Sequence, residues 1–277
     1  MAIQPILIQG PAGPLFAIHH PPAEGVAARG DFLSVPPFAE EMNQARRMAA
    51  VQARRLAHAG YGVLLLDLNG TGDSGGDFAD GRWDGWLGDI AAGLDWLEGQ
   101  GRPLAGLWGL RLGGLLAVEA ARANPARIPR LLLWQPVTSG RTFLNQFLRL
   151  RVAAGLGGMG QRETTATLRA ALAAGEVVEI AGYPIAPALA AAMEDADLAI
   201  PPPQACSVIW LDMVASADTP PPPASVRTIE AWRAAGAQVT HRSVVGEPFW
   251  AVQSWLEPVL VPALWEASLD LLSDDTP

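Results

Sequence analysis

The sequence predicts an α/β protein with a doubly wound, mostly parallel sheet that begins with antiparallel strands and carries a helical insertion. Continuously apolar runs such as "YGVLLLDL" (61–68) and "LAGLWGL" (104–110) are typical of strands buried on both faces. These runs alternate with stretches of helical periodicity, as parallel β-α-β units do. Half of the 277 residues are hydrophobic and 17% are charged, which allows a large core.

The elements of this alternation can be placed in order along the chain. Two short strands, "QPILIQG" and "GPLFAIHH", flank a Gly-Pro turn and predict an antiparallel start. The following elements are a strand at 31–38, a helix at 39–60, a strand at 61–68, a helix at 83–101, a strand at 104–110, a helix at 111–124 and a strand at 130–137. The carboxyl ends of parallel strands lie along one edge of such a sheet, where a site is expected.

After Thr138 the alternation stops, and residues 140–200 are expected to form a helical lid over this edge. Residues 1–139 and 201–277 then make up the core. The insertion is expected to hold helices at 139–158, 162–176 and 186–199, and an extended pair at 177–185 around Gly182. The core resumes with a strand at 206–214, a helix at 226–236, a strand at 238–246 and a helical segment at 251–272.

Charge and composition exclude several classes of function. The formal net charge is −9, which disfavours nucleic acid and anionic membrane surfaces as partners. The chain contains no lysine, which excludes Schiff-base chemistry and a P-loop lysine. No apolar run reaches the roughly 18 residues of a membrane span, and the N-terminus lacks the basic region of a signal peptide. The single cysteine, Cys206, fits a reducing compartment, so we expect a cytoplasmic protein.

Two glycine-rich segments carry the functional information. The loop "DLNGTGDSGG" (67–76) follows a predicted strand, and "GLRLG" (109–113) stands between the next strand and its helix. A steep strand-to-helix turn requires glycines at 109 and 113, because side chains there would collide with the strand or the helix. In order and spacing, these segments resemble the α/β-hydrolase superfamily over nearly the whole chain, with "GLRLG" at the position of its G-x-S-x-G nucleophile elbow.

A narrower set of segments resembles the exosortase A system-associated hydrolases of the second type, bacterial proteins linked to PEP-CTERM protein sorting and polysaccharide export. The segments are "VPPFAEEMNQARRM", "GTGDSGGDF", "WGLRLGGLLA", "LLLWQPVTSGRTFLNQFLRLR" and "GEPFW". This resemblance implies a cytoplasmic accessory protein whose partners belong to the exosortase or polysaccharide-export machinery.

The nucleophile that the superfamily resemblance implies is missing. Arg111 occupies the elbow position and has no hydroxyl, thiol or carboxylate with which to attack. Ser74 and Ser139 stand near the same sheet edge, but they are expected to order a loop and to cap a helix, respectively. Cys206 is interpreted as a buried bystander.

The base and the acid are also in doubt. The loop after the last strand, "VVGEPFWA", holds no histidine. His241 lies within that strand, where a bond to a neighbouring residue is the preferred interpretation. The other histidines are His19, His20 and His58. Asp212 and Asp218 are candidates for the acid, with an ordinary exposed loop aspartate as the alternative for both.

A buried guanidinium requires an anion, and three hypotheses supply one for Arg111. The first is an ion pair with Glu247, with Glu40, Glu41 and Asp73 as substitutes. The second is an anionic or acyl ligand, bound by Arg111 and by backbone N–H groups at Leu112 and Phe38. The third is a structural tie between lid and core. Phe249 and Trp250 are expected either to line the pocket or to pack in the core.

The sequence therefore predicts a degenerate site, with Arg111, Asp212 and Glu247 in the former catalytic positions. The expected role is binding of an anionic or acyl ligand, or of a protein partner. An esterase or thioesterase that uses non-standard residues and a pure interaction protein are the alternatives. No metal cluster or dinucleotide loop is recognisable, so no metal, NAD or ATP is expected.

Overall fold

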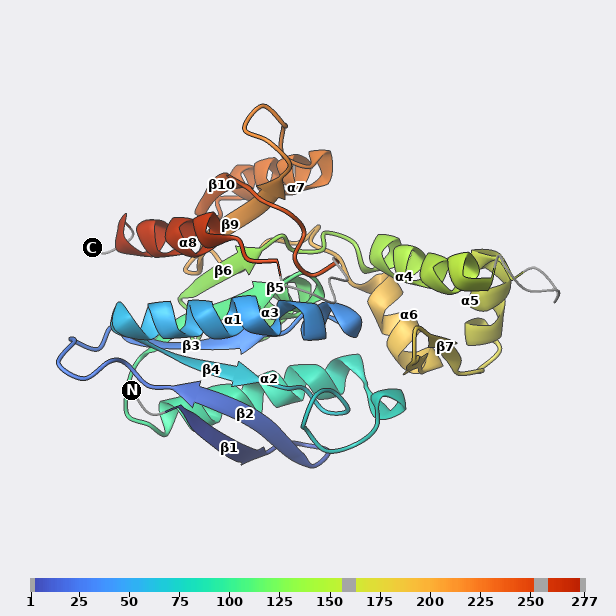
Figure 1. Cartoon of the computed structure of the whole chain (residues 1–277), viewed down its shortest axis with the longest axis horizontal. Helices are drawn as coiled ribbons and strands as arrows, with labels where there is room; N and C mark the ends of the chain where they lie inside the picture. The colour runs from blue at the N-terminus through green and yellow to red at the C-terminus, as the bar shows by residue number, and fades with distance from the viewer. Residues whose placement is uncertain (1–2, 156–162, 252–258, 275–277) are drawn as a thin grey trace.

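The computed structural model describes residues 3–155, 163–251 and 259–274. An eight-stranded sheet in the order β1-β2-β4-β3-β5-β6-β9-β10 forms the centre of the molecule (Figure 1). Its strands are β1 (Gln4–Gln9), β2 (Pro14–His20), β3 (Gly30–Val35), β4 (Tyr61–Leu66), β5 (Leu104–Leu110), β6 (Arg130–Trp134), β9 (Ser207–Val214) and β10 (Val239–Val245). The main helices of the core are α1 (Glu40–His58), α2 (Trp83–Glu98), α3 (Leu112–Ala123), α7 (Pro223–Ala234) and α8 (Pro262–Asp274), and a short 3-10 helix, η1, spans Phe78–Asp80.

The pairing of the strands confirms the predicted mixed sheet. Strand β2 pairs antiparallel with β1 and with β4, whereas all pairings from β4 through β3, β5, β6 and β9 to β10 are parallel. The apolar runs are buried on both faces because helices cover both sides. Leu131 and Leu133 face the cluster that includes α2, α3 and α7, and Leu132, between them, faces α1 and α8.

The predicted helical insertion contains helices and one hairpin. They are α4 (Gly140–Ala154), α5 (Thr165–Ala173), β7 (Val178–Ile180), β8 (Tyr183–Ile185) and α6 (Pro187–Asp195). Figure 1 shows α4, α5 and α6 beyond the arrowheads of β3 and β4, at the carboxyl edge of the sheet. The backbone N–H of Gly140 donates to Ala196 O over 2.9 Å, which ties the two ends of the inserted segment (residues 140–200) together.

Several predicted boundaries shift by a few residues, and the starts of two helices are set by prolines. The last helix begins at Pro262 and not at 251, and residues 259–261 are not helical. The proline at 262 disfavours helical backbone at the residue before it and suits the first turn of a helix. The remainder of that prediction, 252–258, lies outside the described residues, as does 156–158 of the helix predicted at 139–158. Helix α7 begins three residues early, at Pro223, for the same reason.

Two buried histidines lie at the end of β2. His19 and His20 are each 2% exposed. The side chain of His19 lies 3.3 Å from Gln4 Oε1 and 3.4 Å from Arg102 Nη2, and Arg102 donates to both carboxylate oxygens of the buried Asp31. Burial, followed by the charge of nearby arginines, lowers the pKa of both imidazoles to about 4. Both are therefore neutral at pH 7.

Among the described helices, none combines the length and the apolar character needed to span a bilayer.

Candidate functional site

The chain bends sharply between β5 and α3, as the sequence predicts. Arg111 forms this elbow with φ 54° and ψ −120°, a left-handed φ that residues other than glycine rarely adopt. Its backbone is fixed on both sides, because its N–H donates to Trp134 O and its carbonyl accepts from the Val137 N–H, both over 3.0 Å. A conformation of this kind costs about 1–3 kcal/mol and persists only where the surroundings impose it.

The two glycines around the elbow are a steric requirement. A Cβ atom on Gly109 would lie 2.6 Å from the Cα of Gly114. On Gly113, a Cβ would collide with the carbonyl oxygens of Val35 and Pro36, which end β3 and begin the loop after it. The glycine pattern therefore records how closely α3 packs against two strands.

The anion beside Arg111 is Glu41, and the predicted ion pair with Glu247 is wrong. Arg111 Nε and Nη2 both donate to Glu41 Oε1 over 3.2 Å, and the two side chains are 17% and 20% exposed. Helix α1 starts at Glu40, after Ala39 turns the chain with φ 53°, and this turn aims Glu41 at the elbow. Glu247 is exposed to solvent.

Two aromatic rings cover the guanidinium of Arg111. Its Cζ lies 5.1 Å from the ring centre of Trp250 and 5.8 Å from that of Phe143, within the range of cation–π attraction. Trp250 follows β10 in the loop where the resemblance places a histidine, and Phe143 belongs to α4 of the inserted segment. Arg111 thus contacts α1, the inserted segment and the loop after β10 (the core loop).

The ion pair leaves one carboxylate oxygen without a partner. Glu41 Oε2 is buried and accepts no hydrogen bond from the described residues. Burial raises the pKa of Glu41, and the positive charge and hydrogen bonds of Arg111 offset this shift only in part. A buried acceptor without a donor is uncommon in native proteins and makes this oxygen a candidate for binding a ligand.

A cavity of about 250 Å³ opens onto the ion pair. Its walls come from the start of α1, the elbow, α4, the β7–β8 turn and the loop after β10. The lining residues are Glu40, Glu41, Gln44, Arg111, Phe143, Gln146, Phe147, Leu150, Ala181, Trp250 and Ala251. No serine, threonine, cysteine or histidine is among these described residues.

Of the predicted ligand-binding residues, Arg111 and Trp250 line this cavity. Phe38 is 4% exposed and packs against four aromatic rings, including those of Phe143 and Phe147, and Leu112 is 1% exposed at the start of α3. Phe249 is 2% exposed and packs on the rings of Trp134 and Trp250. Together with the exposed Glu247, they lie outside the cavity wall.

Asp212 and His241 form a buried pair on β9 and β10. The Asp212 carboxylate is fully buried and accepts hydrogen bonds from Trp210 Nε1 at 3.0 Å, Ser225 Oγ at 2.9 Å and His241 Nε2 at 2.9 Å. The alternative interpretation as an exposed loop aspartate is therefore wrong for Asp212. It is correct for Asp218, which is exposed in the loop after β9. The interpretation of His241 as a strand residue bonded to a neighbour is confirmed. Neither residue lines the Arg111 cavity.

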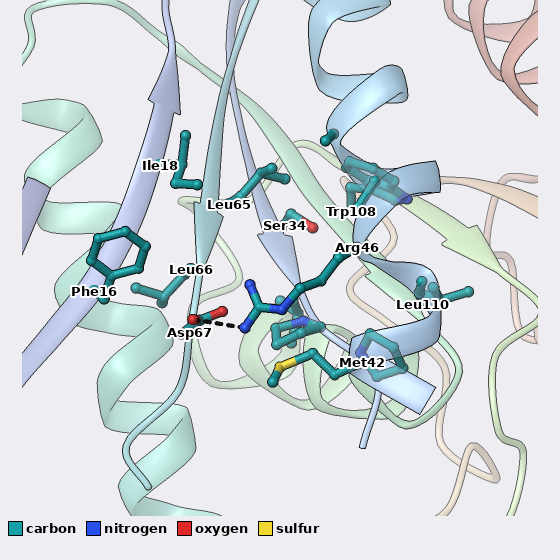
Figure 2. Close-up of a pocket in the computed structure, with 16 residues that line it drawn as sticks. Phe16, Ile18, Ser34, Met42, Arg46, Leu65, Leu66, Asp67, Trp108 and Leu110 are labelled. Atoms are coloured by element: carbon teal, nitrogen blue, oxygen red, sulfur yellow. Dashed lines mark hydrogen bonds and ion pairs between the residues drawn. The ribbon is translucent and has the colours of Figure 1, made fainter. Parts of the chain in front are cut away.

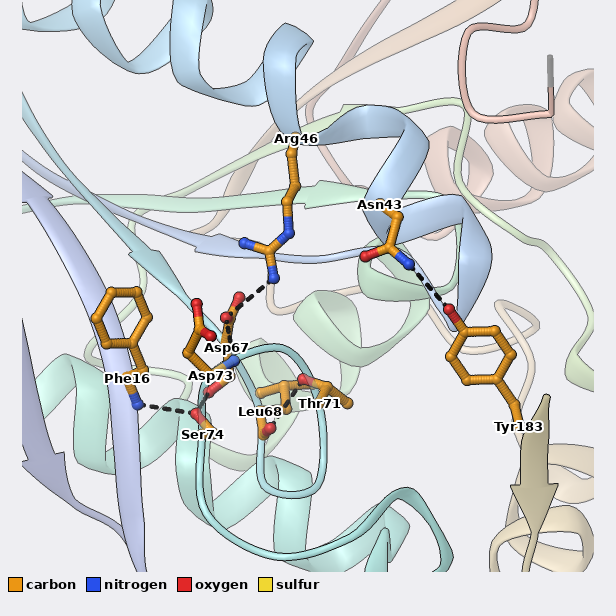
Figure 3. Close-up of polar contacts among 9 residues, drawn as sticks. All are labelled: Phe16, Asn43, Arg46, Asp67, Leu68, Thr71, Asp73, Ser74 and Tyr183. Atoms are coloured by element: carbon orange, nitrogen blue, oxygen red, sulfur yellow. Dashed lines mark hydrogen bonds and ion pairs between the residues drawn. The ribbon is translucent and has the colours of Figure 1, made fainter. Parts of the chain in front are cut away.

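The alternative nucleophiles have structural partners. Figure 3 shows Ser74 Oγ accepting from Phe16 N at 2.8 Å, and the same hydroxyl donates to Asp67 O at 2.6 Å, which orders the glycine-rich loop. Ser139 caps α4 by accepting from Thr142 N. Cys206 is buried, and burial raises the pKa of its thiol to about 12. These contacts agree with the structural roles expected for all three.

The inserted segment contacts α1, which the sequence does not predict. Tyr183 of β8 donates its hydroxyl to Glu40 Oε2 over 3.0 Å. The same hydroxyl accepts from Asn43 Nδ2 over 2.9 Å, a contact drawn in Figure 3. Burial, followed by the neighbouring Glu40 carboxylate, raises the pKa of Tyr183 to about 12. This contact holds the hairpin against the helix that carries Glu41.

An Arg111→Met variant should lose about 2 kcal/mol of stability at pH 8, below the roughly 3–5 kcal/mol of a fully buried pair because both groups keep some solvent contact. Glu41 would lose its counter-charge, so its already raised pKa would rise further. For an acid with a raised folded pKa, the stabilising contribution is present below the unfolded pKa and is lost as the pH rises through the folded pKa. The loss should therefore be smaller at pH 5 than at pH 8, by urea unfolding.

The double variant Arg111→Met/Glu41→Gln is the matched control. It removes the unpaired charge, so it should recover part of the stability at pH 8 and lose the pH dependence. Equal losses at both pH values in the single variant would contradict the assignment of Glu41 as the partner.

Comparisons with known proteins identify the fold. Residues 41–164 match the family described as "Serine aminopeptidase, S33". The sequence matches no curated protein. Est1E from Butyrivibrio proteoclasticus, solved with ferulic acid bound, aligns with a TM-score of 0.68 at 15% identity, covering 97% of this chain and 98% of that one. DcsB, solved with a substrate analogue, aligns with a TM-score of 0.64 at 15% identity, covering 99% and 100%.

A third structure, XC6422 from Xanthomonas campestris, is described as a serine hydrolase without a lid. It aligns with a TM-score of 0.55 at 18% identity, covering 100% of this chain and 98% of that one. The matched segment and the full-length alignments show that the chain has the α/β-hydrolase fold, with Arg111 at the turn that the fold uses for its nucleophile.

Proposed function

We propose that the Arg111 cavity binds the head group of an acyl compound without hydrolysing it. The observation that carries this proposal is the lining of the cavity, in which the elbow presents a guanidinium and the described walls hold no hydroxyl, thiol or imidazole. A guanidinium donates hydrogen bonds and accepts none, so it cannot attack a carbonyl carbon or take a proton from water.

The polar groups in the cavity favour a neutral head group over a free anion. Arg111 is already paired with Glu41, and the second carboxylate in the wall, Glu40, leaves the described lining with one net negative charge, which disfavours an anion. Arg111 Nη1 makes no hydrogen bond with the described residues, and Glu41 Oε2 accepts none. A primary amide or an un-ionised carboxylic acid satisfies both, because its carbonyl accepts from Arg111 and its N–H or O–H donates to Glu41.

The rest of the cavity suits an apolar chain. Phe143, Phe147 and Leu150 of α4 and Trp250 of the core loop supply apolar surface. The volume of about 250 Å³ exceeds the roughly 150 Å³ that holds one benzene molecule. We propose that the inserted segment acts as a lid over the apolar chain of the ligand. The contacts of Tyr183 with α1 hold this lid in place.

Binding is tested by thermal unfolding with octanamide, octanoate and octanol, which share a chain and differ in the head group. Octanamide at ten times its dissociation constant should raise the melting temperature by about 3 °C, and octanoate should raise it less. Arg111→Ala and Glu41→Gln should each abolish the octanamide shift. Arg127→Ala, which removes ion pairs on α2 instead, is the control and should keep it. No shift with any of the three probes would contradict the proposal.

Hydrolysis is tested with short-chain p-nitrophenyl esters. We expect no turnover above the buffer rate, in the parent protein and in Arg111→Ala alike. Arg111→Ser should also be inactive, because no histidine is among the described residues of the cavity to serve as its base. Turnover in the parent that disappears in Arg111→Ala would establish the alternative function.

That alternative is an esterase or thioesterase with non-standard residues. Two observations favour it: the match of residues 41–164 to a serine aminopeptidase family and the 2.9 Å contact between His241 Nε2 and Asp212 Oδ2. It requires a nucleophile within reach of His241, and Ser225 is committed to the same carboxylate. The ester assay, repeated with His241→Gln, distinguishes the two functions.

The resemblance described in the sequence analysis supports a cellular setting for the binder. We propose that it acts in the cytoplasm beside the exosortase A system, and that its protein partners belong to that system or to polysaccharide export. Affinity capture from the native host, compared with a variant that lacks residues 140–200, tests whether the inserted segment recruits such a partner. Capture of none of those proteins would count against this setting.

A further inference from the structure

A second cavity lies on the other side of α1, between this helix and the sheet (Figure 2). Its volume is about 190 Å³, and it shares no lining residue with the Arg111 cavity. Strands β2, β3, β4 and β5 form its floor and α1 forms its roof. The lining residues are Phe16, Ile18, Ser34, Val35, Pro36, Pro37, Met42, Ala45, Arg46, Ala49, Ala50, Leu65, Leu66, Asp67, Trp108 and Leu110.

The cavity exists because α1 turns small side chains toward large ones. Ala45, Ala49 and Ala50 leave space where leucine or methionine would fill the interface between helix and sheet. Opposite them, Phe16 and Leu65 present apolar surface from β2 and β4. Space between apolar walls of this kind is costly to leave empty and is favourable for an apolar molecule to fill.

The cavity contains few polar groups, and their charges are balanced. Ser34 of β3 is 8% exposed and lines the cavity, where its hydroxyl is within reach of a ligand. Arg46 reaches from α1 across one end of the cavity, where its Nη2 donates to Asp67 Oδ2 over 3.1 Å (Figure 2). Asp67 also accepts from the Asp73 N–H over 3.0 Å, which holds the carboxylate in place (Figure 3).

The two partners of this ion pair differ in freedom. The Arg46 side chain is 42% exposed, whereas that of Asp67 is 10% exposed and fixed by its loop. Arg46 can therefore swing into solvent while Asp67 stays, which opens that end of the cavity. Because each charge already has its partner, a charged ligand would lose hydration without gaining a counter-ion.

We propose that this cavity is a second ligand site, for a small, uncharged, mostly apolar molecule that carries one hydrogen-bonding group. The size of the ligand follows from the volume, because a cavity of roughly 150 Å³ holds benzene and this one is about 190 Å³. A fused bicyclic ring such as indole is of the right class. The Ser34 hydroxyl is the hydrogen-bonding partner of the ligand, and Arg46 closes over it.

Indole and indene are a suitable pair of probes, since they have the same shape and differ in one N–H group. Calorimetric titration should give a dissociation constant for indole on the order of 0.1–1 mM, as expected for a ligand of this size. Indene should bind several-fold more weakly. In Ser34→Ala the difference between the two should fall within about twofold, because the acceptor for the N–H is gone.

Filling the cavity provides the decisive test. Ala49→Leu adds a side chain to the roof without loss of helix propensity, and it should weaken indole binding at least tenfold. Arg47→Leu, a substitution at an exposed position of the same helix, should bind indole like the parent. Unchanged binding in Ala49→Leu, or no binding of either probe at several millimolar, would overturn the proposal.

Nuclear Overhauser contacts in the parent protein keep the test decisive even if Ala49→Leu does not fold. With methyl labelling, bound indole should contact the methyl groups of Ile18 and Leu65, which line this cavity. Contacts with Leu150, which lines the Arg111 cavity, would place the probe in the other site and overturn the proposal.

Discussion

Gly113→Ala should destabilise the protein by about 4 kcal/mol or more and leave most of it insoluble on expression. The added Cβ would collide with two carbonyl oxygens, those of Val35 and Pro36. Both are backbone atoms at the end of a central strand, so no side chain can rotate away to relieve the contact. Either α3 moves off the sheet or the elbow at Arg111 gives up its conformation.

Gly155→Ala is the matched control for this substitution. Gly155 follows α4 with φ −78°, and a Cβ there meets no atom of the described residues within 4 Å. Its stability by urea unfolding should stay within about 0.5 kcal/mol of the parent or rise slightly. If Gly113→Ala were soluble and within about 1 kcal/mol of the parent, the tight packing between α3 and β3 would be refuted.

Acidification from pH 6.5 to pH 4 should remove a large part of the stability. His19 and His20 have a pKa of about 4 in the folded protein, against 6.5 for the free side chain. A basic group with a lowered folded pKa stabilises the protein above its unfolded pKa, and this contribution is lost as the pH falls toward the folded pKa. Each histidine should contribute a loss of about 2 kcal/mol at pH 5 and about 3 kcal/mol below pH 4.

A comparison of variants isolates this contribution from that of other groups. Buried carboxylates with raised pKa values, such as Glu41 and Asp89, act in the opposite direction over the same range. His19 and His20 together cause one part of the parent's loss of stability between pH 6.5 and pH 4. In His20→Leu that part should fall to about half. His58→Gln, at an exposed position, should retain the full loss. Parallel curves for parent and His20→Leu would refute the assignment.

The fold could be predicted because its signals are local. Apolar runs marked the buried strands, and periodicity marked the helices between them. Gly109 located the elbow through a local contact, because its Cβ would meet Gly114 of the following helix, whereas the need for Gly113 comes from Val35 and Pro36 of a strand distant in the sequence. The insertion followed from the break in the alternation after Thr138. The last helix begins later than its apolar periodicity predicts, because the proline at 262 disfavours helical backbone at the residue before it.

The partner of Arg111 could not be chosen from the sequence, because it depends on contacts across the fold. Glu41 lies seventy positions away, and its aim depends on a left-handed φ at Ala39, a residue type that gives no sign of such a turn. The contact of Tyr183 with α1 spans an even longer stretch of chain. Residues 40 and 43 do give a sequence signal for a contact at this place. Both are polar and lie three positions apart, so in a helix they share one face near the carboxyl edge of the sheet.

The backbone at residue 111 is braced entirely by other positions, through the bonds to Trp134 and Val137 and through the glycines on either side. The point of attachment of this side chain and the direction of its Cα–Cβ bond are therefore set by other residues, whichever side chain stands there. An engineer could exchange that one codon for a series of acids, amides and alcohols, and compare them in a scaffold that does not shift.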